Sequence, residues 1–246
     1  MLIALITDIH GNDLALGACL ARAKELAAER MVFLGDFVGY GAEPEKVVRR
    51  VMELVGQGAL ALMGNHDEAI GRPSAGMNFL AALALQWTRQ QLSPQAKAFL
   101  AGLPMSVREG DCLYVHAEAR APRAWTYVTG AEAARASFAA TDARVTFCGH
   151  VHVPSLYCLS ETAKIIAHKP VTNIAIPLSE QRRWLAVIGS AGQPRDGNPA
   201  AAFATYDTVS RALTFRRAPY DAEAAAAKIR AAGLPEQLAA RLLVGR

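Results

Sequence analysis

Acidic, histidine and asparagine residues occur directly after apolar segments throughout this sequence. Asp8 and His10 follow the first apolar segment, and Asp36 follows the second. Later apolar segments are followed by the remaining members of this polar set, which are Asn65, His66, His116, His150 and His152. Carboxylate, amide and imidazole groups are ligands that suit manganese, iron and zinc ions. The residue types therefore predict a centre that binds divalent metal ions.

Buried strands are expected to position these polar residues. The sequence predicts strands over residues 2–7, 31–34 and 59–63, separated by helices over 12–29 and from residue 43 onward. Alternating strands and helices predict right-handed crossovers and a parallel sheet. Because ligands bind beyond the carboxyl ends of such strands, the polar residues should converge at one edge of the sheet.

The second half of the sequence contains more strands than helices. Helices are predicted over 78–92, 93–100 and 131–140, and two more are predicted after Asp221 and Pro235. Strands are predicted over 105–108, 112–115, 144–148, 155–159, 164–168, 183–189, 201–207 and 211–217. This order predicts one α/β domain over residues 1–246, with a parallel-rich first half and an antiparallel second half. Two packed sheets with helices outside are expected, and residues 221–246 are expected to form accessory helices.

Composition and charge argue against several classes of protein. The chain has 246 residues with 26 Lys+Arg and 22 Asp+Glu, and its basic residues are scattered, so we do not expect nucleic acid as a partner. No apolar run approaches the ~18 residues that cross a bilayer, and the N-terminus lacks the features of a signal peptide. The 4 cysteines show no disulfide or C-x-x-C spacing. A cytoplasmic protein without membrane contact is therefore expected.

Short motifs follow the predicted strands in a defined order. They are Asp8-x-His10, Gly35-Asp36, Gly64-Asn65-His66-Asp67, His116 alone and Gly149-His150-Val151-His152. Each motif alone is weak, but the ordered set resembles the calcineurin-like metallophosphoesterases from residue 8 to residue 152. This resemblance implies a metal-dependent phosphatase or phosphodiesterase. It also implies a four-layer α/β/β/α sandwich of two mixed sheets.

The resemblance further implies a pair of metal ions. Asp8, His10 and His152 would hold one ion, and Asp36 would bridge to the other. The second ion would be held by Asn65, His116 and His150. Mn²⁺ or Fe²⁺/Fe³⁺ is expected, and Zn²⁺ is also compatible with these ligands. A water shared by both ions would attack phosphorus as a bridging hydroxide.

The third motif would supply the remaining catalytic groups. His66 would stabilise the charge on the leaving group or protonate it, and Asp67 would orient the His66 ring. Only two ligands, Asp8 and Asp36, are anionic, so two divalent ions would leave a net charge of about +2 that attracts phosphate.

Several of these residues also have structural explanations that the sequence leaves open. His116 could be a buried, hydrogen-bonded histidine, and His66 with Asp67 could be a helix-capping pair. An N-cap role is favoured for Asn12 over a contact with substrate. The remaining two candidates, Cys148 and His168, are interpreted as strand residues.

Substrate contacts are less well defined by the sequence. Protein Ser/Thr phosphatases continue Gly-Asp with an Asp-Arg pair that helps bind phosphate, but Phe37 and Val38 stand there in this chain. Arg195 is the candidate replacement, because residues 189–197 form either a phosphate-binding loop or a tight surface loop. Glu118 would weaken the positive field or contact a substrate amine or hydroxyl.

The leading hypothesis is a two-metal phosphoesterase that hydrolyses phosphomonoesters or small phosphodiesters, including nucleotides. One alternative is a dinucleoside polyphosphate hydrolase. A second alternative is a non-catalytic, metal-binding scaffold of the same fold. A phosphorylated small molecule or nucleotide is the expected partner, and the sequence predicts no particular oligomeric state.

Overall fold

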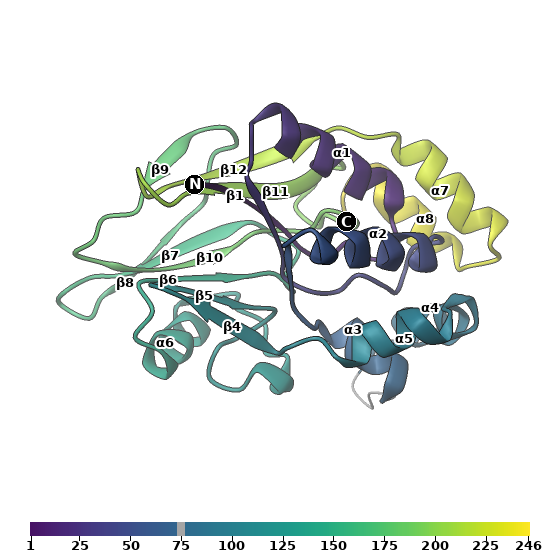
Figure 1. Cartoon of the computed structure of the whole chain (residues 1–246), viewed down its shortest axis with the longest axis horizontal. Coiled ribbons are helices and arrows are strands. Elements are labelled where there is room, and N and C mark those ends of the chain that lie inside the picture. The colour runs from purple at the N-terminus through teal and green to yellow at the C-terminus, as the bar shows by residue number, and fades with distance from the viewer. Residues whose placement is uncertain (73–76) are drawn as a thin grey trace.

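Two mixed β-sheets lie face to face at the centre of the protein (Figure 1). The computed structural model describes residues 1–72 and 77–246. The first sheet has the strand order β3 (Leu60–Ala61), β2 (Arg30–Phe33), β1 (Leu2–Ile6), β11 (Ala201–Asp207), β12 (Ala212–Ala218) and β9 (Ala175–Pro177). The second has the order β4 (Ser106–Glu109), β5 (Cys112–Val115), β6 (Val145–Cys148), β10 (Arg183–Val187), β7 (Ser155–Leu159) and β8 (Ile165–His168).

Helices cover the outer faces of both sheets. The first sheet is covered by α1 (Asp13–Glu25) and α2 (Pro44–Gly56), and the second by α6 (Ala131–Ala140). Successive side chains of a strand point to opposite faces, and β1 shows the result. Ile3 and Leu5 pack between the sheets, whereas Ala4 and Ile6 pack against the helices. The predicted sandwich of two mixed sheets flanked by helices is thereby confirmed.

The remaining helices surround one end of the sandwich. They are α3 (Asn65–Gly71), α4 (Phe79–Gln91), α5 (Pro94–Ala101), α7 (Ala222–Ala231) and α8 (Glu236–Val244). The last two pack on α4 and on the Tyr40 side chain in a separate apolar cluster. Within the described ranges, no helix has both the length and the apolar character needed to cross a bilayer.

Parallel strands direct the predicted polar residues to a common edge. Strands β3, β2 and β1 pair in parallel, and so do β5, β6 and β10. The prediction of an antiparallel second half was therefore wrong for these latter pairs. Strand β9 and helix α3 were not predicted at all, because each is short and α3 carries the polar Asn65-His66-Asp67 sequence.

Candidate metal centre

The loops after the parallel strands bring the predicted ligands together in a buried cluster. Three overlapping groups of side chains place their ligand atoms within 4.8 Å of one another. The groups are Asp8, His10 and His152; His10, Asp36 and His66; and Asp36, His116 and His150. Asn65 joins the third group, because its Oδ1 lies 3.3 Å from Nε2 of His116. Residues from opposite ends of the motif series, such as Asp8 and His152, thus share one site.

Four histidines of the cluster each form a hydrogen bond between one ring nitrogen and a backbone carbonyl. The pairs are His10 Nδ1 with Val38 O (3.0 Å), His116 Nδ1 with Leu34 O (2.7 Å), His152 Nδ1 with Gln193 O (2.6 Å) and His150 Nε2 with Trp125 O (2.8 Å). A carbonyl oxygen only accepts, so the paired nitrogen carries the hydrogen. In the neutral ring, the other nitrogen keeps its lone pair for a metal ion, which is the usual arrangement around metal-ligating histidines.

The two carboxylates are also arranged as metal ligands. Asp8 Oδ2 accepts hydrogen bonds from Thr7 Oγ1 at 2.7 Å and from the His150 N–H at 2.9 Å. Its other oxygen, Oδ1, is buried without a hydrogen-bond partner among the described residues and lies 3.1 Å from His152 Nε2. Leaving a buried carboxylate oxygen unpaired is costly, and a bound cation removes that cost. This orphaned oxygen shows that the site fits a metal ion.

Asp36 lies between the two halves of the cluster. Its Oδ1 accepts the backbone N–H of His66 at 2.8 Å, which fixes the carboxylate. Its Oδ2 lies 3.7 Å from His10 Nε2 and 3.4 Å from His116 Nε2. The same oxygen can therefore be approached by ions on both sides.

Burial and mutual charge shift the protonation of the cluster. Burial would raise the pKa of Asp36, but the nearby His116 and His66 hold it well below its ordinary value. Burial would lower the pKa of His116, but the Asp36 and Asp8 carboxylates and the Leu34 carbonyl raise it to about 9. Burial dominates at His66 and His150 and lowers the pKa of each to about 4. A strong negative field is therefore concentrated beside His116.

Several candidate ligands have a backbone conformation that is uncommon outside glycine. Asp8, His10, Asp36, His150 and His152 have φ angles of 53°, 49°, 58°, 66° and 65°. Left-handed residues with side chains are infrequent and often accompany functional sites, where the surrounding structure holds them in place. Five of the seven candidate ligands thus have this strained backbone conformation.

The sequence belongs to a known family. The sequence model of the calcineurin-like phosphoesterase superfamily domain matches residues 1–211. This chain belongs to that superfamily. The phosphoesterase is therefore a metal-dependent hydrolase of phosphate esters, as its motifs predicted.

Three proteins are similar to this one over the whole chain. The uncharacterized protein MJ0912 of Methanocaldococcus jannaschii is 33% identical over 251 residues, covering 100% of the phosphoesterase and 98% of its relative. A metallophosphoesterase from Sphaerobacter thermophilus has a TM-score of 0.88 and 36% identity, with 100% and 99% of the two chains covered. The hypothetical protein PH1004 from Pyrococcus horikoshii shares the fold, with a TM-score of 0.80 at 19% identity and coverage of 100% and 98%.

Asp67 has a different contact from the one expected. Its carboxylate accepts the backbone N–H groups of Asp36 (2.7 Å), Phe37 (2.9 Å) and Gly64 (3.0 Å), and it does not orient the His66 ring. The prediction of an Asp67–His66 contact was therefore wrong, and the helix-capping alternative is confirmed for Asp67. His66 Nδ1 is buried without a hydrogen-bond partner among the described residues, and its ring lies 4.6 Å from that of Tyr40.

Asn12 and Glu118 are held by the fold of the phosphoesterase. Asn12 Oδ1 caps α1, and its amide nitrogen donates to Gly192 O at 3.0 Å and to Tyr220 Oη at 3.2 Å. The N-cap interpretation is confirmed, and no amide hydrogen of Asn12 is left for a substrate. Glu118 Oε1 accepts a hydrogen bond from the nearby Arg120 N at 2.6 Å. It also accepts one from Ser137 Oγ on α6 at 3.4 Å. Its Oε2 is buried without a hydrogen-bond partner among the described residues, and the two roles considered for Glu118 stay predictions.

The remaining candidates are Cys148, His168 and Arg195. Cys148 is buried in β6 and His168 is exposed in β8, so both are strand residues. Arg195 is half-buried; its Nη2 donates to Gln193 Oε1 at 3.0 Å, and its guanidinium carbon lies 5.9 Å from the centre of the Tyr40 ring. The loop that carries Arg195 also supplies the carbonyl that binds His152.

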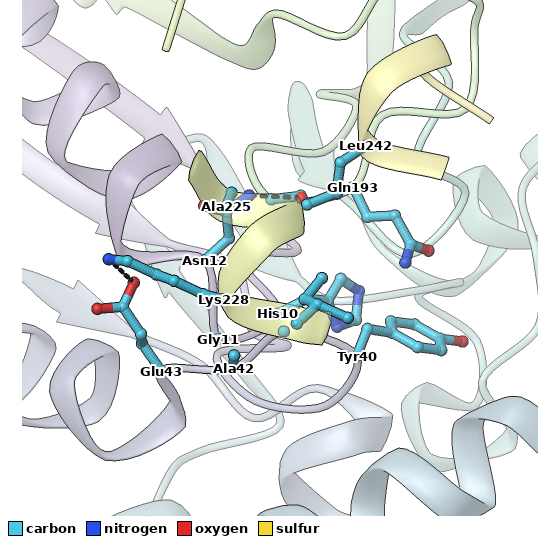
Figure 2. A pocket seen from close by; sticks show the side chains of 13 residues that line it. His10, Gly11, Asn12, Tyr40, Ala42, Glu43, Gln193, Ala225, Lys228 and Leu242 are labelled. Atoms are coloured by element: carbon cyan, nitrogen blue, oxygen red, sulfur yellow. Dashed lines mark hydrogen bonds and ion pairs between the residues drawn. The ribbon is translucent and has the colours of Figure 1, made fainter. Parts of the chain in front are cut away.

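Two cavities adjoin the cluster. Helices α7 and α8 lie over the loops that carry His10 and Tyr40, with Lys228 bonded to Glu43 at 2.8 Å (Figure 2). The cavity they enclose holds about 10 Å³, which is room for about one water and no substrate. A second cavity of about 230 Å³ opens beside His66 and His150, and aromatic side chains line it: Tyr40, Trp125 and Tyr127. Sequence analysis did not identify these three aromatics, because they belong to none of the motifs.

Proposed function

We propose that this protein hydrolyses phosphomonoesters or small phosphodiesters with a pair of divalent metal ions. Asp8, His10 and His152 would hold one ion, and Asp36 would bridge to the second. The second ion would be held by Asn65, His116 and His150. The observation that carries this proposal is the set of four histidines that each pair one ring nitrogen with a backbone carbonyl, in a cluster where Nε2 of His10, His116 and His152 lies 3.1–3.7 Å from a buried carboxylate.

The ions, when bound, supply Lewis-acid chemistry and lower the pKa of a coordinated water toward ~7. The chain itself would position the phosphate and exclude bulk water. Arg195 is fixed by Gln193 near the site and can donate to two phosphate oxygens. His66 is 4% exposed and faces the same cavity as Asn65 and His150, so its ring can donate to the leaving oxygen.

Residues 1–246 would act as one domain, with α7 and α8 as accessory helices. Their apolar packing on Tyr40 and the Lys228–Glu43 ion pair at 2.8 Å support this assignment. Mn²⁺ or iron is the proposed metal, and Zn²⁺ is also compatible, because the ligands mix oxygen and nitrogen.

The test is hydrolysis by purified protein loaded with Mn²⁺, Fe²⁺ or Zn²⁺. p-Nitrophenyl phosphate and its bis ester report monoesterase and diesterase activity, and diadenosine tetraphosphate tests the dinucleotide alternative. Asp36→Asn should abolish activity, whereas Asp142→Asn, on a carboxylate that is 85% exposed, should leave it unchanged. Activity that survives both chelation and Asp36→Asn would refute the proposal, and full metal loading without hydrolysis would favour the scaffold alternative.

A further inference from the structure

The cavity beside the metal centre has an aromatic lining that packing alone does not require. The Tyr127 ring stacks on His150, with centroids 4.1 Å apart and an interplanar angle of 15°. Tyr127 is nevertheless 50% exposed, so the ring face that does not cover His150 is accessible. An accessible aromatic face at the rim of a site is a surface on which a planar group can stack.

Trp125 is fixed beside Tyr127 by contacts at both of its ends. Its indole Nε1–H donates to Glu68 Oε2 at 3.1 Å, and its carbonyl oxygen is bound by His150 at 2.8 Å. Its φ of 53° is unusual for a bulky side chain. The protein thus holds an indole ring in a strained conformation at the wall of this cavity, which is a pattern that occurs at binding sites.

Tyr40 also lines this cavity and shares this conformation. Its φ is 61°, and it is held between the His66 ring at 4.6 Å and the Arg195 guanidinium at 5.9 Å. The other lining residues are neutral: Asn65, His66, Met77, Asn78, Ala81, Ala124 and His150. Among the described residues, the cavity lining therefore offers aromatic and apolar surface and carries no formal charge, directly beside the proposed ligands Asn65 and His150.

We propose that Tyr40, Trp125 and Tyr127 form a subsite for the leaving group of the phosphate ester, and that this subsite selects leaving groups that contain an aromatic ring. The proposal rests on the proposed phosphoester hydrolysis, because it needs the phosphate to lie at the metal cluster. An ester held there projects its leaving group past Asn65 and His150 into this cavity. Nucleosides and simple aryl or benzyl alcohols share the required planar ring.

Matched substrate pairs separate ring recognition from leaving-group chemistry. Adenosine 5′-phosphate and ribose 5-phosphate have the same kind of primary leaving oxygen, with and without a base. Benzyl phosphate and cyclohexylmethyl phosphate have rings of similar size, one aromatic and one saturated. Stacking of one base on an aromatic side chain predicts a preference of roughly five-fold or more in kcat/KM for the aromatic member, mainly through KM.

Tyr127→Leu is the decisive variant, because Tyr127 is exposed and the substitution leaves an apolar side chain. It should reduce the preference toward one, and Tyr127→Phe should retain it. A preference in kcat/KM for adenosine 5′-phosphate, without a preference for benzyl phosphate, would identify nucleosides as the leaving groups that the subsite selects. The opposite result would identify aryl alcohols. Equal losses for aromatic and saturated esters would overturn the proposal, since they would show that Tyr127 only supports His150.

A binding experiment separates this subsite from the proposed function. Saturation-transfer NMR with adenosine, and with ribose as the control, reports weak binding to the leaving-group site without hydrolysis. Transfer to adenine protons that is lost in Tyr127→Leu would support the subsite even if no phosphate ester were hydrolysed. Hydrolysis without aromatic preference or transfer to adenosine would overturn the subsite and leave the proposed function intact.

Discussion

Substitution of Gly64 by alanine tests whether Asp36 must occupy its observed position. Gly64 precedes α3 with φ −100° and ψ 173°, a conformation that alanine adopts readily. A Cβ atom at this position would lie 2.2 Å from Asp36 Oδ1 and 2.3 Å from the Asp36 backbone nitrogen. Any effect of the substitution therefore comes from contact with Asp36 and not from backbone strain at Gly64.

The size of the effect follows from these distances. Asp36 would have to retreat by about 1 Å to reach ordinary van der Waals contact. A displacement of that size at a reacting centre costs about 100-fold in rate. It would also move Oδ2, which lies 3.7 Å from His10 and 3.4 Å from His116, away from the position between them. Overpacking of this kind lowers the free energy of unfolding by about 1–3 kcal/mol.

The assay measures bound metal, kcat/KM for p-nitrophenyl phosphate and the melting temperature in the same preparations. Gly56→Ala is the matched control, because a Cβ there meets nothing within 4 Å. We expect Gly64→Ala to lose metal and about 100-fold or more in kcat/KM while remaining folded. Metal content and kcat/KM equal to those of the parent would refute the idea that a fixed Asp36 joins the two halves of the cluster.

Three further predictions address other parts of the centre. Mn²⁺ at about 100 times its Kd should stabilise the protein by about 2.7 kcal/mol. This should appear as a rise of roughly 5–10 °C in Tm that a chelator reverses. No shift would show that the orphaned Asp8 oxygen does not bind metal. Arg195→Ala should raise KM for phosphate esters about ten-fold with less effect on kcat. As a control, Arg182→Ala, at an exposed arginine, should change neither constant. An unchanged KM in Arg195→Ala would show that Arg195 does not bind the phosphate. In metal-free protein, His150→Gly should have a Tm roughly 2–4 °C higher than that of His150→Ala. The φ angle at this position is 66°, which glycine adopts without the cost that alanine has. Equal melting temperatures would show that the backbone is not strained at this position.

The sequence predicted that the candidate ligands converge, because residue type and strand position carry most of that information. Asp8, Asp36 and His116 each follow a buried parallel strand, and parallel strands bring their carboxyl ends to one edge whatever lies between them. The same reasoning failed for Asp67, since the sequence cannot show which neighbour a buried carboxylate chooses. Asp67 accepts hydrogen bonds from backbone N–H groups of the loop that carries Asp36, and not from the His66 ring.

The aromatic cavity could not be predicted for a different reason. Trp125 and Tyr127 lie in a segment with no periodic pattern, and only the tertiary contacts with His150 and Glu68 bring that segment to the metal centre. Tyr40 lies next to a motif, yet its neighbours Gly39 and Gly41 indicated only a turn. In the structure the backbone of this turn lies close to the His66 ring, because a Cβ at Gly39 would lie 2.3 Å from His66 Nδ1.

The left-handed residues explain why the ligands occur as Asp-x-His and His-x-His pairs. Asp8 and His10 both have positive φ, as do His150 and His152, so each loop turns sharply at two positions separated by one residue. The turns place His10 Nε2 and His152 Nε2 3.1 Å apart, although two neutral lone pairs at that distance repel. Strain of roughly 1–2 kcal/mol per residue at these positions, added to that repulsion, is comparable with the whole stability of a typical domain. A cation between the two nitrogens would turn this repulsion into attraction, so metal binding would offset part of the cost that the surrounding structure otherwise bears.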